Sequence, residues 1–137
     1  MLQANDLETV MPLRSDLDVL KARQTGKELA ASLRFTNSER TIIATAISEI
    51  ARNTVLYAQA GRMQLKLIRQ GIRRGLLVVA EDDGPGIPDL KLAMQDGYTT
   101  SRGLGIGLPG AKRLMDEFDI VSEVGKGTII TMKKWER

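Results

Sequence analysis

The chain has 137 residues, of which 42% are hydrophobic and 27% charged, a composition typical of one compact domain with its own core. Its 20 Lys and Arg against 17 Asp and Glu leave a net charge of +3, with no basic block of the kind that binds nucleic acid. The absence of Cys and His excludes disulfides, Cys-based zinc sites, nucleophilic catalysis by Cys or by a Ser–His pair, and a phosphohistidine on this chain.

The N-terminal segment gives no sign of export. It carries Asp6 and Glu8 and lacks the apolar region of a secretion signal. No apolar run in the sequence approaches the roughly 18 residues of a membrane span. We therefore expect a cytoplasmic protein, with residues 1–137 forming a single domain that has no membrane segment.

The first third of the chain predicts a short strand and two helices. The strand is expected at residues 9–13, and Ser15 then stands where a helix N-cap is needed. The first helix is expected to run to Phe35 on an apolar stripe made of Leu17, Leu20, Ala22, Leu29, Ala30 and Leu33. A second helix follows the capping signal at residues 36–39, and its broad apolar stripe predicts one buried face.

The rest of the chain alternates predicted strands with glycine-rich loops. Strands are expected at residues 63–69 and 75–81, and the continuous apolar run of the second predicts a central place in a sheet. A short amphipathic helix that ends at Phe118 is expected after Pro109. A Gly-Lys-Gly turn joins two last strands at residues 119–124 and 128–135. This order predicts an α/β (α+β) two-layer sandwich with helices on one face of a mixed sheet.

Glu49 and Asn53 form the first candidate motif. They lie four residues apart on the second predicted helix, so their side chains project from the same face. A carboxylate and an amide oxygen in this arrangement suit a hydrated Mg²⁺ and a nucleophile that must be oriented. The alternative is an ordinary solvent-facing polar pair, which is common on helices.

A second motif, Asp82-x-Gly84-x-Gly86, directly follows the predicted central strand. Its glycines allow the backbone to approach a ligand, and a buried carboxylate at Asp82 accepts a hydrogen bond from an exocyclic amine such as that of adenine. The alternative is a plain turn. A third motif, Gly127-Thr128, opens the last strand. The hydroxyl of Thr128 would bind the same adenine as Asp82, directly or through water. The alternative is a hairpin turn followed by a β-branched residue with no ligand.

A second glycine cluster spans residues 103–107, just before the predicted helix that contains Pro109. Its backbone N–H groups and the positive end of the helix dipole would bind phosphates. The alternative is a flexible loop without a ligand. Two other glycine patterns are excluded. The dinucleotide fingerprint requires a strand before it, and a polar loop stands there instead; the P-loop requires a Lys where this chain has Ala111.

Taken in order, the four motifs resemble the N, G1, G2 and G3 boxes of the gyrase, Hsp90, histidine-kinase and MutL (GHKL) ATPase superfamily. The segments at residues 46–53, 81–88 and 108–118 are similar to the stand-alone serine/threonine kinases of bacterial stress signalling, in particular the RsbT-type switch kinases of the stressosome. The resemblance implies a single histidine-kinase-like ATPase domain with a Bergerat-type ATP-binding fold, and ATP and Mg²⁺ as cofactors.

The resemblance also implies a role for each matching residue. Glu49 would be the general base for a seryl or threonyl hydroxyl, Asn53 a ligand of Mg²⁺, and Asp82 the reader of adenine. The residues expected to bind ATP are Asn53, Asp82, Gly84, Gly86, Ile87, Arg102, Gly103, Leu104, Gly105, Ile106, Gly107, Leu108, Lys112 and Thr128. Of these, Arg102 and Lys112 flank the second glycine cluster, where a cation would neutralise phosphate charge.

Two absent features, a further domain and a histidine, indicate which branch of the superfamily the chain resembles. Gyrase, Hsp90 and MutL types carry a further domain that supplies a lysine, and histidine kinases phosphorylate a histidine on a helical domain. The remaining branch phosphorylates Ser or Thr of STAS-domain antagonist proteins, and its RsbT type activates a PP2C-type phosphatase once released. The alternative is a binding module, such as an anti-sigma factor, although Glu49 favours catalysis because binding needs no base. Neither nucleic acid nor a membrane is an expected partner.

Overall fold

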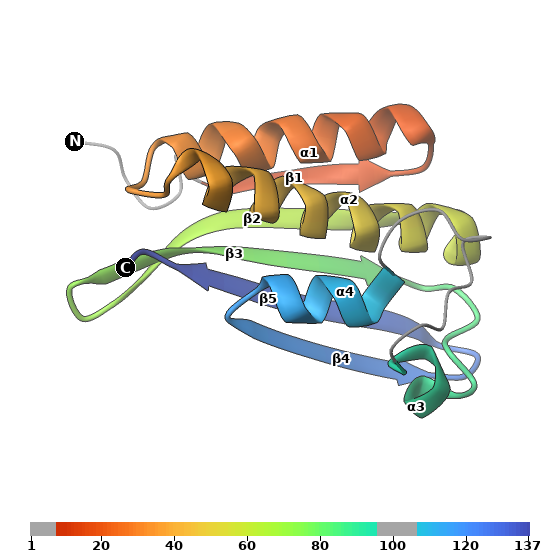
Figure 1. Ribbon diagram of the computed structural model, residues 1–137. Helices are drawn as coiled ribbons and strands as arrows, with labels where there is room; N and C mark the ends of the chain where they lie inside the picture. The colour runs from red at the N-terminus through yellow and green to blue at the C-terminus, as the bar shows by residue number, and fades with distance from the viewer. Residues whose placement is uncertain (1–7, 96–106) are drawn as a thin grey trace.

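The computed structural model describes residues 8–95 and 107–137. Its elements are, in chain order, β1 (Glu8–Leu13), α1 (Asp16–Ala31), α2 (Asn37–Ala58), β2 (Gly61–Gln70), β3 (Arg73–Asp82), α3 (Leu90–Ala93), α4 (Gly107–Leu114), β4 (Glu117–Glu123) and β5 (Gly127–Trp135). The strands form one five-stranded sheet in the order β1-β2-β3-β5-β4, and Figure 1 shows α1, α2 and α4 on the same face of it. The predicted two-layer sandwich is therefore confirmed.

The direction of the strands corrects one expectation. Every neighbouring pair in the described sheet is antiparallel, so the prediction of a mixed sheet was wrong. Two helices separate β1 from β2. The chain therefore runs along the sheet twice between these strands and enters β2 in the direction opposite to that of β1. A parallel pair needs a single helical crossover between its strands, and no neighbouring pair here is joined in that way.

Helix α1 begins where the sequence predicts, and its buried face agrees with the prediction in part. The side chain of Ser15 accepts a hydrogen bond from the Asp18 backbone N–H at 3.3 Å, as an N-cap does. The helix ends at Ala31 rather than at Phe35, and Leu17 and Leu20 are 58% and 61% exposed. Ala22, Ala30 and Leu33 are buried as predicted, and the small residues Val19 and Gly26 complete the buried stripe. These allow α1 to pack closely on α2, since a Cβ on Gly26 would lie 2.2 Å from Cδ1 of Ile47.

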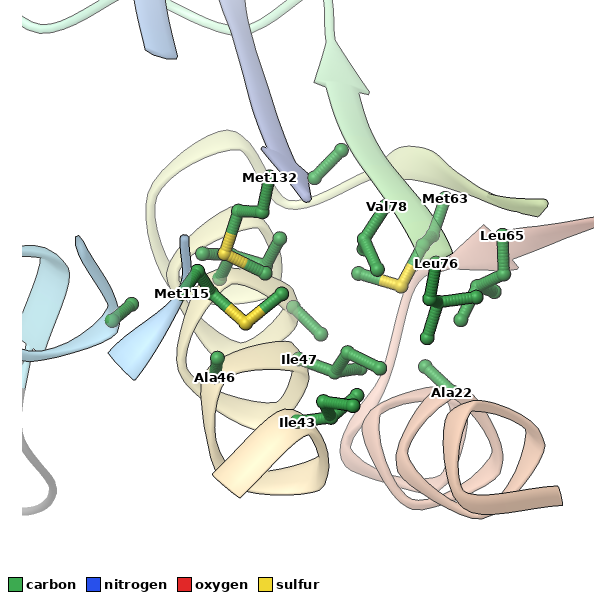
Figure 2. Packing of buried hydrophobic residues seen from close by; sticks show 14 of the residues in the cluster. Ala22, Ile43, Ala46, Ile47, Met63, Leu65, Leu76, Val78, Met115 and Met132 are labelled. Carbon is green, nitrogen blue, oxygen red and sulfur yellow. The ribbon is translucent and has the colours of Figure 1, made fainter. Parts of the chain in front are cut away.

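Helix α2 lies at the centre of the helical layer. It begins with the predicted capping box, in which Thr36 and Glu39 exchange hydrogen bonds between side chain and backbone. Figure 2 shows the side chains of Ile43 and Ile47 among those of the sheet residues Met63, Leu65, Leu76 and Val78. All six are completely buried, so this packing fixes the depth and rotation of α2, and with them the position of Glu49 two residues later.

The remaining elements agree with the sequence apart from two details. β3 is the middle strand, as its continuous apolar run predicts. Phe118, expected at the end of the last helix, belongs to β4, and α3 was not predicted because it has only four residues. No helix in the described ranges is long and apolar enough to cross a membrane.

The C-terminal end of the chain is held against the sheet by Glu136. Its carboxylate accepts two hydrogen bonds from the Arg74 side chain, at 3.1 and 3.0 Å, and another from the Arg34 backbone N–H. Burial opposes the charge, but the interactions with Arg74 and Arg34 outweigh it and hold the pKa of Glu136 below its usual value. The segment after α1 and the end of β5 are thereby joined through one side chain.

We expect Glu136→Gln to lower the free energy of unfolding by about 1 kcal/mol at neutral pH, since Arg74 is partly exposed. Because the folded-state pKa is depressed, this stabilisation is complete above the unfolded pKa of about 4.3 and is lost as pH falls through the folded value. Urea unfolding from pH 7 to pH 2.5 measures it, with the exposed Glu123→Gln as control. A difference from wild type that does not shrink in acid would contradict the assignment.

Candidate functional site

A cavity of about 360 Å³ lies between the C-terminal half of α2, the loop after β3, α3 and the start of the described part of α4. Its walls combine apolar side chains with a few polar ones, as is usual for sites that bind small molecules. The lining residues are Glu49, Arg52, Asn53, Leu56, Tyr57, Pro85, Gly86, Ile87, Pro88, Asp89, Leu92, Ala93, Gly107 and Leu108. One of the four predicted motifs, Glu49 with Asn53, and the last glycines of two others, Gly86 and Gly107, therefore meet at one cavity.

Glu49 is the buried acid of this cavity. Its side chain is only 8% exposed, and both carboxylate oxygens are engaged. Oε1 accepts a hydrogen bond from Nη1 of Arg52 at 3.0 Å, and Oε2 accepts one from the Gly107 backbone N–H at 3.1 Å. The ordinary solvent-facing pair that the sequence left open does not describe Glu49, because a buried carboxylate of this kind needs partners and has them.

Asn53 lines the cavity one turn beyond Glu49 on the same face of α2. An amide oxygen is a hard ligand, and Mg²⁺ in nucleotide sites uses one or two protein oxygens while phosphates and water supply the rest. The donor set around the cavity therefore fits a magnesium ion that arrives with a nucleotide. Asn53 is the residue that would hold it.

Asp82 is the last residue of β3 and is 8% exposed. Its Oδ1 accepts a hydrogen bond from the Gly84 backbone N–H at 2.8 Å, which fixes the carboxylate at the start of the loop. Gly84 packs against α2, where a Cβ would lie 2.6 Å from that of Ala58. The side chain of Asp82 does not itself line the cavity, and the loop that it orders supplies five of the cavity's residues.

Thr128 faces Asp82 across the strand pair β3–β5 and belongs to a hydroxyl network. Its Oγ1 lies 2.8 Å from Oγ of Ser122, and that same Oγ accepts a hydrogen bond from the Ile87 backbone N–H at 2.7 Å. Sequence reasoning missed Ser122, because it stands alone in a strand and belongs to none of the motifs. Only the pairing of β4 with β5 brings it beside Thr128.

Two glycines near this network have no room for a side chain. A Cβ on Gly86 would lie 2.4 Å from the carbonyl oxygen of Glu123, and one on Gly127 would lie 2.0 Å from that of Asp82. Both glycines also have positive φ, at +78° and +128°. The loop after β3 and the hairpin before β5 are thus in direct backbone contact, and Gly125 N–H donates to the Pro85 carbonyl at 2.9 Å.

We expect Gly127→Ala to lower the free energy of unfolding by more than about 3 kcal/mol, because a methyl group there meets backbone atoms that have no room to move. Gly125→Ala is a matched control: its φ is +83°, but no atom lies within 4 Å of the added Cβ, so only about 1 kcal/mol of backbone strain is expected. Urea unfolding of both variants measures the difference. Equal losses would show that the close contact does not matter.

The second glycine cluster falls mostly outside the described residues. Arg102, Gly103, Leu104, Gly105 and Ile106 all lie there, so their predicted roles stay predictions. Gly107 lies at the cavity with φ +68°, a left-handed conformation that favours glycine. Leu108 also lines the cavity, whereas Lys112 is exposed on α4 and is not among the lining residues.

Three cavity residues on α2 were not predicted as part of the site. Arg52 directly precedes Asn53, and Leu56 and Tyr57 follow it by three and four residues, which places them one turn further along the same face. That helical spacing from Asn53 is the signal that could have found the latter two. Arg52 stands three residues after Glu49, a spacing shared by many solvent-facing pairs, so only the burial of Glu49 distinguishes it.

Comparisons with known proteins agree with this architecture. A family model described as histidine kinase-, DNA gyrase B- and HSP90-like ATPase matches residues 38–137. The serine/threonine-protein kinase RsbT of Bacillus subtilis is 45% identical over 130 residues, covering 95% of this chain and 98% of that protein. An anti-sigma F factor of Clostridium kluyveri is 32% identical over 117 residues, covering 82% of each chain.

Among solved structures, the RsbU and RsbW domains of a Mycobacterium tuberculosis protein are similar to the chain, with a TM-score of 0.62 at 17% sequence identity. The match covers 94% of this chain and 33% of that one. At this identity the likeness concerns the fold alone.

Proposed function

The chain belongs to the family of histidine kinase-, DNA gyrase B- and HSP90-like ATPases, and on that premise we propose that it is a serine/threonine protein kinase that uses ATP. The observation that carries the proposal is the buried carboxylate of Glu49 in the cavity. A module that only binds nucleotide has no need of a carboxylate there, because phosphates and a carboxylate repel each other. A kinase, in contrast, needs a carboxylate in that position to accept the proton of the hydroxyl that is phosphorylated.

In the proposed complex the phosphates lie in the cavity near α4, and the base reaches past the loop after β3, beyond the cavity lining, toward Asp82. Asp82 would accept a hydrogen bond from the exocyclic amine of adenine, and Thr128 would assist through its hydroxyl. The ring of Tyr57 and the side chain of Leu56 offer apolar surface to the base. The amide of Gly107 and the N-terminus of α4 offer hydrogen bonds and a positive dipole to the phosphates.

Phosphoryl transfer requires the protein mainly to position the reactants and to neutralise charge. Glu49 would take the proton of the seryl or threonyl hydroxyl as the hydroxyl oxygen bonds to the γ-phosphorus, and the bond from that phosphorus to the bridging oxygen of ADP breaks. A magnesium ion, when bound, neutralises charge on the phosphates. Asn53 would hold that ion, and the apolar walls of the cavity would limit access of water.

The acceptor that we propose is a Ser or Thr on a STAS-domain protein, and the second partner is a PP2C-type phosphatase. The names of the relatives support a Ser or Thr acceptor and a protein partner, whereas the STAS-domain and phosphatase partners come from the family resemblance. One is a serine/threonine-protein kinase and another is an anti-sigma factor. A small kinase of this type would alternate between partners, phosphorylating one and activating the other once it is released.

Transfer to a partner tests the proposal. The protein is incubated with Mg²⁺, ATP and a purified STAS-domain protein, and mass spectrometry then locates added phosphate. Phosphate on a Ser or Thr of that protein is the expected result. Binding of ATP with no phosphate on any of a panel of STAS-domain proteins would contradict the kinase and favour the alternative, a nucleotide-dependent module that sequesters its partner as an anti-sigma factor does.

A further inference from the structure

The contacts of Glu49 point to a residue whose role is not covered by any of the four motifs. One carboxylate oxygen is bound by the side chain of Arg52 and the other by the backbone amide of Gly107, at 3.0 and 3.1 Å. The two donors differ in kind. Arg52 stands three residues away on the same helix, whereas Gly107 belongs to α4.

The pair between Arg52 and Glu49 differs from the surface ion pairs of this chain. Glu49 is 8% exposed, whereas the acidic partners of Arg62 are 38% and 83% exposed. An exposed ion pair contributes little to stability. A buried carboxylate that loses its cation is an unpaired buried charge, which is energetically unfavourable and no longer held in position. Arg52 also lines the cavity, so the ion pair with Glu49 borders the space in which the proposed reaction takes place.

The Gly107 amide, which the proposed function assigns to a phosphate, donates to Glu49 in this structure. It is at the start of the described part of α4, where the helix dipole favours an anion, and in this structure the anion is Oε2 of Glu49. In the proposed complex a terminal phosphate and this oxygen would therefore compete for one N–H. When the phosphate takes the amide, Oε2 is left without a donor and is able to accept a proton.

Resting on the proposed function, we propose that Arg52 is a positioning residue for Glu49. It holds Oε1, so that the carboxylate stays in place when ATP withdraws the Gly107 amide from Oε2. The proton of the acceptor hydroxyl then passes to Oε2 as its oxygen bonds to the γ-phosphorus, and ADP leaves with the electron pair of the broken bond. Binding of ATP thereby converts Glu49 from a fully hydrogen-bonded carboxylate into a base.

Arg52→Gln tests this role, with Arg52→Lys as the conservative variant. We expect Arg52→Gln to lower kcat by about 10- to 100-fold, since a displaced base loses most of its effect, with KM for ATP within about threefold of wild type. Arg52→Lys is expected to retain more of kcat than Arg52→Gln, because it keeps a cation beside Glu49. Arg62→Gln is the matched control, because Arg62 also pairs with a carboxylate, that of Glu81, outside the cavity lining. It is expected to leave kcat unchanged.

A second measurement needs no turnover. Glu49→Gln removes the negative charge that competes for the Gly107 amide, so calorimetry is expected to show that the affinity for ATP rises about tenfold relative to that for ADP. An unchanged ratio would overturn the competition. A large loss of ATP affinity in Arg52→Gln with normal kcat would make Arg52 a phosphate ligand instead.

The outcomes separate this inference from the proposed function. If wild type transfers phosphate and Arg52→Gln does so at the same kcat, the positioning role is wrong and the kinase stands. If wild type transfers no phosphate to any partner, the kinase itself is wrong. The ratio of ATP to ADP affinity in Glu49→Gln still tests the competition in that case.

Discussion

Asp82→Asn is expected to weaken the binding of ATP by about 100-fold while the protein stays folded. The carboxylate has two oxygens that accept hydrogen bonds and no donor, and Oδ1 already accepts from the Gly84 amide. In the proposed complex the other oxygen accepts from the amine of adenine. An asparagine keeps the bond to Gly84 through its own oxygen but presents an amide NH₂ to the base, so two donors face each other.

Calorimetric titration with ATP measures this loss, and urea unfolding shows that the variant is folded. Asp83→Asn is the matched control, because Asp83 is the adjacent acid, 83% exposed and paired with Arg62 only at 3.6 Å. It is expected to bind ATP as wild type does. Equal affinity in both variants would mean that Asp82 has only the structural task of fixing the loop.

The second large effect is expected for Glu49→Gln, which should lower the rate of phosphoryl transfer by about 1,000-fold. Glutamine has nearly the same shape, and its oxygen still accepts a hydrogen bond from Gly107 or Arg52. What it lacks is the ability to take a proton from the acceptor hydroxyl. The loss is therefore expected in kcat, while ATP binds at least as tightly as to wild type.

Single-turnover transfer from labelled ATP to a STAS-domain partner measures this rate. Glu28→Gln, a charge change at an exposed position of α1, is the control and is expected to react at the wild-type rate. A Glu49→Gln protein that transfers phosphate at the wild-type rate would contradict the role of base, and the carboxylate would then be structural.

Much of the fold follows from local signals in the sequence. The caps at Ser15 and Thr36 fix where the first two helices begin, and a continuous apolar run identifies β3 as the central strand. The face of α1 followed only in part: Ala22 and Ala30 are buried as predicted, but α1 packs closely on α2 through Gly26, and Leu17 is exposed. Small residues on the buried side are visible only once the neighbouring helix is in place.

The candidate site shows the same division. Spacing on one helix was enough to bring Glu49 and Asn53 to a single face, and both line the cavity. Ser122 was missed because it reaches Thr128 only through the pairing of two strands, and Arg52 because its importance depends on the burial of its partner. That the chain forms one domain over residues 1–137, and that Arg102 and Lys112 bind phosphate, stay predictions.

The central claim is that nucleotide binds in the cavity between α2, the loop after β3 and α4. Amide chemical shifts recorded by NMR as Mg-ATP is added test it most directly. The account predicts the largest changes at Asn53, Gly86, Ile87 and Gly107, with little change in the groove between α1 and α2 around Gln24 and Thr41. Changes confined to that groove, with the four cavity amides unmoved, would contradict it.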